Sequence, residues 1–196
     1  MRKPELLSVH ETEIVNPWKT LTSRDIYENE WIILQEDKVI SPRGLKSLYA
    51  RIKFKKRTVG IIALEEDKHL WLVGQYRYPI DRYSWEIPGG GASKNEDVLG
   101  AAKRELKEET GLTANKWHLI LHMYTCNSIT DEEVFIFLAK ELLHGKMELE
   151  ETERIILKKI PSQFALEMIN HGLITDAVSI AGLLKLMFNE NISNLR

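Results

Sequence analysis

The chain has 196 residues, of which 43% are hydrophobic and 29% charged, and its formal net charge is −2. This composition is that of a soluble globular protein, and the length suits one well-packed core with at most a small appendage. The nearly balanced charge argues against a general binder of nucleic acid or of anionic membranes, so we expect neither as a partner.

The cysteine content and the apolar runs indicate the compartment. The single cysteine, Cys126, excludes a disulfide within the chain and fits a reducing environment. Residues 1–17 contain no apolar run long enough for a signal peptide, and no other stretch approaches the ~20 apolar residues of a membrane span. We therefore expect a cytoplasmic protein.

The first part of the chain predicts a β-hairpin. Residues 31–40 and 45–54 are strand-like runs, and residues 41–44 between them have the composition of a turn. Because a small hairpin cannot bury a core alone, we expect residues 1–56 to form a β unit that packs on something else. Residues 57–196 would then form the main domain.

The rest of the chain predicts a mixture of strands and helices. Strand character is found at residues 58–64, 69–76, 117–124, 133–139 and 153–158. Helical patterns close the chain at residues 164–169, which end before Gly172, and at residues 177–188, which Thr175 and Asp176 would cap. The expected fold class is α+β, with helices packed on a mixed sheet.

A further helix is predicted in the middle of the chain, after a glycine-rich loop at residues 88–91. Ser93 followed by Glu96 is a capping-box signal for the start of this helix. Gly111 suits the left-handed conformation in which helices commonly end.

Three carboxylates crowd one turn of this predicted helix: Glu105, Glu108 and Glu109. Residues three and four apart on a helix are neighbours, and each like-charge pair costs roughly 0.2–0.5 kcal/mol unless something neutralises it. Mg²⁺ would neutralise them, since it prefers oxygen ligands and leaves positions open for phosphate oxygens. The alternative is a solvated helix face, in which Lys103 and Lys107 balance the charge.

The glutamates belong to a longer pattern, G-x5-E-x7-R-E-L-x-E-E-x-G-L, which begins at Gly90 and ends at Leu112. At average residue frequencies, a chance match to these nine positions is on the order of one in a billion per window. The pattern resembles the signature of the Nudix hydrolases and matches it without a departure. The resemblance extends over most of the chain from about Thr58, and it implies an α/β/α sandwich that hydrolyses a diphosphate linked to a nucleoside.

The resemblance also implies the metal site. Glu105 and Glu109 would be the principal ligands of Mg²⁺, with Mn²⁺ as a possible substitute. Glu108 would support them, and the backbone carbonyl of Gly89 would be a further ligand. Such metals polarise phosphoryl oxygens and lower the pKa of a bound water.

The acid–base residues are less sharply indicated. By resemblance to the ADP-ribose pyrophosphatase branch, the acidic loop after the box would supply Glu151 as the general base and Glu153 as one more metal ligand. The acidic run at residues 131–133 competes with them, and solvation alone explains many such runs. Arg104 is expected to act beside Glu108 by holding a carboxylate, for which Glu96 is the expected partner.

Substrate contacts are expected in two segments, residues 75–79 and 85–90, which resemble the nucleoside diphosphate sugar pyrophosphatases. These enzymes act on ADP-ribose, ADP-glucose and GDP-mannose. Arg77 suits a bidentate contact to phosphate, and Glu86 suits ribose hydroxyls or the metal shell. Gly90 is also expected to contact the substrate. The alternative for Arg77 and Glu86 is that each simply lies at the end of a strand without a role at the substrate.

Aromatic residues near the start offer platforms for the base. Trp18 and Trp31 would stack on it, with Arg51 as a further contact to the nucleotide, although tryptophans are more often part of a core.

The ADP-ribose branch often carries a proline within the stretch that corresponds to residues 125–132, and this chain has none. Another sugar nucleotide is therefore as well supported as ADP-ribose.

The resemblance implies a homodimer, in which residues 1–56 pack across the partner subunit.

Two other functions stay open at this point. The basic run at residues 53–57 hints at a dinucleoside polyphosphate or RNA-cap hydrolase. A non-catalytic nucleotide-sensing module is the other alternative, and the presence of every box glutamate argues against it.

Overall fold

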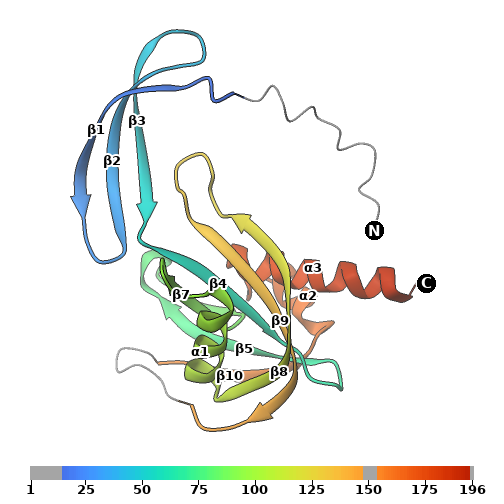
Figure 1. The fold of residues 1–196 in the computed structure, drawn as a ribbon. Coiled ribbons are helices and arrows are strands. Elements are labelled where there is room, and N and C mark those ends of the chain that lie inside the picture. Colours follow the sequence, from blue (N-terminus) through green and yellow to red (C-terminus); the bar gives the residue numbers. More distant parts are fainter. Residues whose placement is uncertain (1–14, 148–153, 195–196) are drawn as a thin grey trace. The chain divides into compact units, whose positions relative to one another are not determined.

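The computed structural model describes residues 15–147 and 154–194, and Figure 1 shows its helices and strands. The strands are β1 (Lys19–Glu28), β2 (Ile32–Ile40), β3 (Lys46–Phe54), β4 (Lys56–Ala63), β5 (His69–Arg77), β6 (Arg82–Glu86), β7 (Gly89–Ser93), β8 (Leu112–Tyr124), β9 (Glu133–His144) and β10 (Ile156–Pro161). The helices are the 3-10 turn η3 (Tyr78–Ile80), α1 (Val98–Thr110), α2 (Phe164–Asn170) and α3 (Ala177–Asn194). The chain divides into two compact units, residues 1–53 and 54–196.

The first unit is a three-stranded sheet in the order β1-β2-β3. The predicted hairpin is confirmed as β2 and β3, and Gly44 in the turn between them has a φ of 80°, which glycine adopts without strain. Strand β1 was not predicted. All ten of its residues are exposed and mostly polar, so it lacks the apolar alternation that marks a strand in sequence, and its antiparallel pairing with β2 is what defines it.

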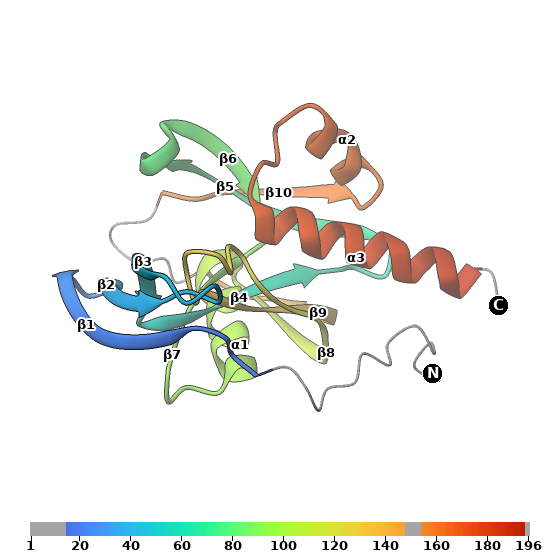
Figure 2. The same cartoon turned by 90° about the horizontal axis from the view of Figure 1, so that it is seen from above.

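The second unit contains two sheets. Four strands form a mixed sheet in the order β7-β4-β9-β8, in which β4 and β9 are parallel, and three strands form an antiparallel sheet in the order β10-β5-β6. Helices α1 and α3 lie on opposite faces of the four-stranded sheet (Figure 2). The expected α+β class with a mixed sheet between helices is confirmed.

Alternation along β4 explains how the sheet serves both helices. Successive side chains of a strand point to opposite faces. Ile62 packs into the core that contains Leu183 of α3, while Ile61 packs into the core that contains Leu106 of α1. Both isoleucines are at most 1% exposed. The continuous apolar run of this strand therefore reflects burial on both faces.

The helix of the signature begins later than its capping-box signal predicts. Asp97 is the N-cap, and its carboxylate accepts a hydrogen bond from the Gly100 N–H at 2.9 Å. Ser93 ends β7 instead, although its N–H does donate to the Glu96 carboxylate at 3.1 Å. The predicted end is confirmed, since Gly111 has a φ of 70° and donates to the Lys107 carbonyl.

The predicted loop at residues 88–91 is also wrong in part, because Gly89 already begins β7. This strand pairs with β4 in antiparallel register, from Lys56 opposite Ser93 to Gly60 opposite Gly89. Glycine has a low strand propensity, but backbone pairing with a central strand outweighs it here.

The closing helices agree with the predictions. Helix α2 is followed by Gly172 at a φ of 68°, and α3 is preceded by Asp176, whose carboxylate accepts from the Ser179 N–H at 2.7 Å. Within the part of the chain that the structure describes, none of the helices is both long and apolar enough to cross a bilayer.

Candidate active site

Arg104, on the exposed side of α1, joins three carboxylates. Its Nε donates to Glu96 at 3.1 Å, and its Nη1 donates to Glu105 at 2.8 Å and to Glu108 at 2.9 Å. Its Nη2 donates to the carbonyl of Gly91 in β7 at 3.0 Å. The expected partnership with Glu96 is thus present, and the guanidinium also bridges two of the predicted metal ligands.

These contacts shift the titration of both partners. The hydrogen bonds from Arg104 hold the pKa of Glu96 below its ordinary value of 4.5. Burial works against the charge of Arg104, but its hydrogen bonds to Glu96, Glu105 and Glu108 outweigh that cost and raise its pKa. Glu96 and Arg104 therefore stabilise each other's charged form.

Glu109 faces the interior and is only 3% exposed. Its Oε2 accepts a hydrogen bond from the backbone N–H of Gly89 at 2.8 Å. This contact ties the end of α1 to the start of β7, so the two predicted ligand residues Gly89 and Glu109 are held together. A buried carboxylate needs such donors or a positive charge to stay ionised.

Gly90 leaves room for Glu105. A Cβ at Gly90 would lie 2.5 Å from the carboxyl carbon of Glu105, closer than real side chains approach. The backbone of β7 therefore runs directly beside this carboxylate, and glycine within a strand often marks such a close approach of another group. Three predicted site residues, Gly89, Gly90 and Glu105, meet at this place.

The donor set has the chemistry of a hard-cation site, because carboxylate oxygens gather beside a backbone that glycine keeps open. Within residues 15–147 and 154–194, however, no three Asp, Glu, His or Cys side chains are arranged around one point. The Arg104 guanidinium stands between Glu105 and Glu108 and neutralises them. The oxygen chemistry of these residues suits a divalent cation, and such a cation would compete with Arg104 for Glu105 and Glu108.

The acidic loop predicted to supply the base lies outside the described residues. Glu151 and Glu153 both belong to it, and their roles stay predictions. Each residue of the competing acidic run has a separate structural contact. Asp131 accepts from the Phe54 N–H at 2.7 Å, Glu132 accepts from the Thr58 hydroxyl at 3.0 Å, and Glu133 pairs with His122 at 2.9 Å.

Arg77 and Glu86 lie on neighbouring strands and bind each other. The Arg77 Nε donates to both carboxylate oxygens of Glu86, at 2.9 and 3.2 Å, and the Nη2 donates as well. The hydrogen bonds to Glu86 raise the pKa of Arg77, and the charges of Asp176 and Glu109 add to the effect. Arg77 therefore lies within electrostatic reach of Glu109 on α1.

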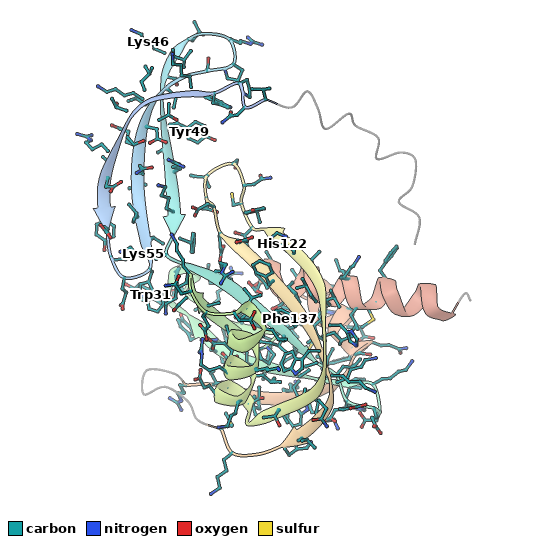
Figure 3. All side chains as sticks on the ribbon, viewed as in Figure 1. Trp31, Lys46, Tyr49, Lys55, His122 and Phe137 are labelled. Atoms are coloured by element: carbon teal, nitrogen blue, oxygen red, sulfur yellow. The ribbon has the colours of Figure 1, made fainter. Side chains whose placement is uncertain are left out.

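The predicted contacts to the base belong to the first unit, and their role at the substrate stays a prediction. Trp18 meets Tyr49 edge to face, with ring centroids 5.4 Å apart, and Trp31 lies at the turn between β1 and β2 (Figure 3). Arg51 forms an ion pair with the buried Asp37 at 2.8 Å and donates to Gln35 at 2.7 Å.

Two positioning residues were not predicted from the sequence. The Nη2 of Arg57 donates to the carbonyls of Ser93, Lys94 and Glu96, the last at 2.5 Å, and so holds the loop before α1. The hydroxyl of Ser179 accepts from the Ile87 N–H at 3.0 Å, just before the glycines of β7. Arg57 belongs to a basic run and Ser179 to an apolar helix, and neither pattern signals such a contact.

Comparison with known proteins agrees with this geometry. The family model of the NUDIX domain matches residues 54–162. The ADP-ribose pyrophosphatase of Bacillus subtilis is 34% identical over 161 residues, covering 81% of this chain and 86% of the relative. The methanol dehydrogenase activator of Bacillus methanolicus is 29% identical over 180 residues, covering 90% of this chain and 96% of the relative.

A solved structure shares the fold. The crystal structure of an ADP compounds hydrolase superposes with a TM-score of 0.80 at 20% identity, and the match covers 89% of this chain and 95% of that one. The signature on α1, the buried Glu109 beside Gly89 and the match of the family model over residues 54–162 lead to one conclusion: the chain belongs to the Nudix family and is a Nudix hydrolase.

Proposed function

We propose that this enzyme hydrolyses the pyrophosphate bond of nucleoside diphosphate sugars of the ADP-ribose, ADP-glucose or GDP-mannose type, with Mg²⁺ as its cofactor. The products would be a nucleoside monophosphate and a sugar phosphate. The observation that carries the proposal is the arrangement of Glu105, Glu108 and Glu109 beside the glycine strand β7. The similarity to an ADP-ribose pyrophosphatase over most of both chains supports the substrate class.

Glu105, Glu108, Glu109 and the carbonyl of Gly89 would hold the cation, together with Glu153 from the acidic loop. When bound, a divalent cation supplies polarisation of phosphoryl oxygens and a bound water of lowered pKa. The chain's own residues prepare the site before that. The Gly89 N–H orients the buried Glu109, and Arg104 holds Glu105 and Glu108 in place through its ion pairs with both.

Three further contributions come from the protein. We propose Glu151 as the base that takes the proton from the attacking water. Arg77, held by Glu86, lies within electrostatic reach of Glu109 on α1 and is proposed to contact a substrate phosphate. Trp18 and Trp31 are proposed to stack on the base, and Arg51 to contact the nucleotide.

The test is a panel of nucleoside diphosphate sugars and dinucleoside polyphosphates, incubated with Mg²⁺, Mn²⁺ or EDTA in ¹⁸O-labelled water. We expect a nucleoside monophosphate and a sugar phosphate from the sugar nucleotides, with one product labelled and no turnover in EDTA. Release of a nucleoside diphosphate and free sugar would refute the proposal. Selective hydrolysis of dinucleoside polyphosphates would favour the other diphosphate chemistry.

Glu109→Gln provides the matching variant. The glutamine oxygen still accepts from the Gly89 N–H, so the fold should persist, while the charge for the cation is lost. We expect turnover to fall by at least ~100-fold, a loss typical of groups that stabilise developing charge. Glu167→Gln, on the exposed side of α2, is the control and should keep full activity. Equal activity of both variants would remove Glu109 from the site.

We also propose a homodimer in which the first unit takes part. Of the described hydrophobic residues in this unit, only Val39 is buried, whereas Trp31, Leu45 and Leu48 are more than half exposed. A small three-stranded sheet with exposed apolar side chains of this kind needs a further surface to cover it. Sedimentation at micromolar concentration should give twice the chain mass of 22.7 kDa, and a monomer alone would contradict the proposal.

A further inference from the structure

A pocket of about 370 Å³ lies where the ends of β5 and β6 meet the start of α3. Two contacts fix its walls, since the Trp85 N–H donates to the Leu173 carbonyl at 3.1 Å and the Ile87 N–H donates to the Ser179 hydroxyl at 3.0 Å. Its volume is within the range of ~300–1,000 Å³ that is common for small-molecule sites.

The charged groups of the pocket are Arg77, Glu86 and Asp176. Glu86 is only 6% exposed, and its carboxylate is held by the Arg77 guanidinium. Two carboxylates outnumber one guanidinium here, so the pocket offers no net positive charge to an anionic group beyond the phosphate that Arg77 is proposed to contact. It suits a neutral ligand that both donates and accepts hydrogen bonds.

A buried hydroxyl without a hydrogen-bond partner, that of Ser84, is a second observation that points to a ligand in this pocket. It lines the pocket and is only 1% exposed, and its hydroxyl has no hydrogen-bond partner among the described residues. Buried hydroxyls without a partner are uncommon, so this one needs an explanation. Ser84 and Glu86 are two residues apart on β6 and therefore share a face. A ligand that bonds one of them is placed to bond the other.

We propose that this pocket binds the hydroxyl groups of the sugar in the diphosphate substrate, with Ser84, Glu86 and Asp176 as the hydrogen-bonding residues. The inference rests on the proposed function and adds the residues that select the sugar. Glu86 and Asp176 accept hydrogen bonds from sugar hydroxyls, and the Ser84 hydroxyl can donate or accept.

The remaining lining favours a sugar over a nucleobase. Pro79, Ile80 and Ala177 provide apolar contact for the C–H groups of a sugar ring, and Thr175 adds one more hydroxyl. None of the described lining residues is aromatic, whereas binding of a base commonly uses an aromatic ring for stacking.

The pocket is connected to the proposed metal ligands through β6 and β7. Glu86 precedes Gly89 by three residues, and the Gly89 N–H holds Glu109 of α1. The charge of Glu109 reaches Arg77 in the pocket and contributes to its raised pKa. A diphosphate at the carboxylates of α1 can therefore extend its sugar toward Ser84.

The test compares two substrates that share the same pyrophosphate: a nucleoside diphosphate sugar and the corresponding nucleoside diphosphate methyl ester, which lacks the sugar hydroxyls. kcat/KM is measured for both with the wild type, Ser84→Ala and Thr175→Val. Thr175 is exposed, so its variant should fold even if the change at Ser84 disturbs the core. Ser162→Ala, at a serine that is 2% exposed and outside the pocket, is the control for burial.

We expect Ser84→Ala to lower kcat/KM for the sugar nucleotide roughly 5- to 20-fold, the effect of one or two lost hydrogen bonds, with a smaller loss for Thr175→Val. Neither variant should change kcat/KM for the methyl ester more than about twofold, and the control should leave the ratio of the two unchanged. Suppose that the wild type hydrolyses the sugar nucleotide while both variants keep the wild-type ratio of kcat/KM between the two substrates. That result would overturn the proposed sugar pocket but leave the proposed function intact. A wild type that hydrolyses neither substrate would overturn the proposed function and this inference with it.

Discussion

Replacing Arg104 with glutamine removes a counter-charge that Glu96, Glu105 and Glu108 share. The side chains of the three carboxylates are 13–29% exposed and that of Arg104 is 38% exposed, so solvent screens the pairs only in part. Partly exposed pairs each contribute up to ~1 kcal/mol. We therefore expect Arg104→Gln to lower the free energy of unfolding by about 1–3 kcal/mol in EDTA at neutral pH.

The pH dependence has a definite sign. The folded-state pKa of Glu96 lies below its ordinary value of 4.5, so its contribution is present above that value and lost as the pH falls through the folded pKa. The difference between wild type and variant should be largest near pH 7 and should shrink toward about pH 4 and below. The proposed Mg²⁺ would stabilise the folded variant more than the wild type, because Arg104 no longer competes with it for Glu105 and Glu108, so adding Mg²⁺ at neutral pH should also narrow the difference.

Urea unfolding followed by fluorescence measures these free energies at each pH, with and without Mg²⁺. Lys103→Gln is the matched control, because it removes one positive charge from an exposed position on the same helix. If Arg104→Gln destabilised the protein no more than this control, Arg104 would not stabilise the carboxylate cluster. A difference that stayed constant down to the acid end would also contradict that role.

Three further variants test the strand β7 and the two side chains, those of Arg57 and Ser179, that hydrogen-bond the backbone on either side of it. Gly90→Ala should lower kcat at least ~10-fold without unfolding the protein, because the new Cβ would collide with the Glu105 carboxylate; circular dichroism and initial rates check this. Arg57→Met should cost about 1–3 kcal/mol in urea unfolding and weaken Mg²⁺ binding in calorimetry, because three carbonyls before α1 lose their donor. Ser179→Ala should cost about 1–3 kcal/mol in urea unfolding, because the Ile87 N–H loses its acceptor, and an unchanged midpoint would exclude that role.

The elements that the sequence predicted correctly are those with local signals. Strands β4 and β5 are dense in apolar and β-branched residues, and the stops at Gly111 and Gly172 need only the conformational freedom of one residue. Strand β1 has no such signal, since every one of its residues is exposed. The sequence of strand β7 has a misleading signal, because its glycines predict a loop. Only its pairing with β4 makes this segment a strand.

The site follows the same division. Helical spacing predicts Glu105 next to Glu108, which are three residues apart. The contacts of Arg104 with these two glutamates were not predicted, although they too join residues that are close on the helix. The contact between Glu109 and Gly89 spans twenty residues and depends on how β7 packs against α1. The pocket around Ser84 depends on α3, whose first residues lie some ninety positions away, and no local pattern predicts that distance.

A series of hydrogen bonds connects the start of α3 to the backbone that precedes the proposed metal ligands. Asp176 holds the Ser179 N–H and hydroxyl at 2.7 Å each, and that hydroxyl accepts from Ile87. Ile87 is two residues before Gly89, whose N–H orients Glu109. These hydrogen bonds link the start of α3 to the backbone that leads into β7, whose pairing with β4 holds it in the sheet. Asp176 therefore lines the proposed sugar pocket and also, through Ser179, supports the backbone that leads to the proposed metal ligands.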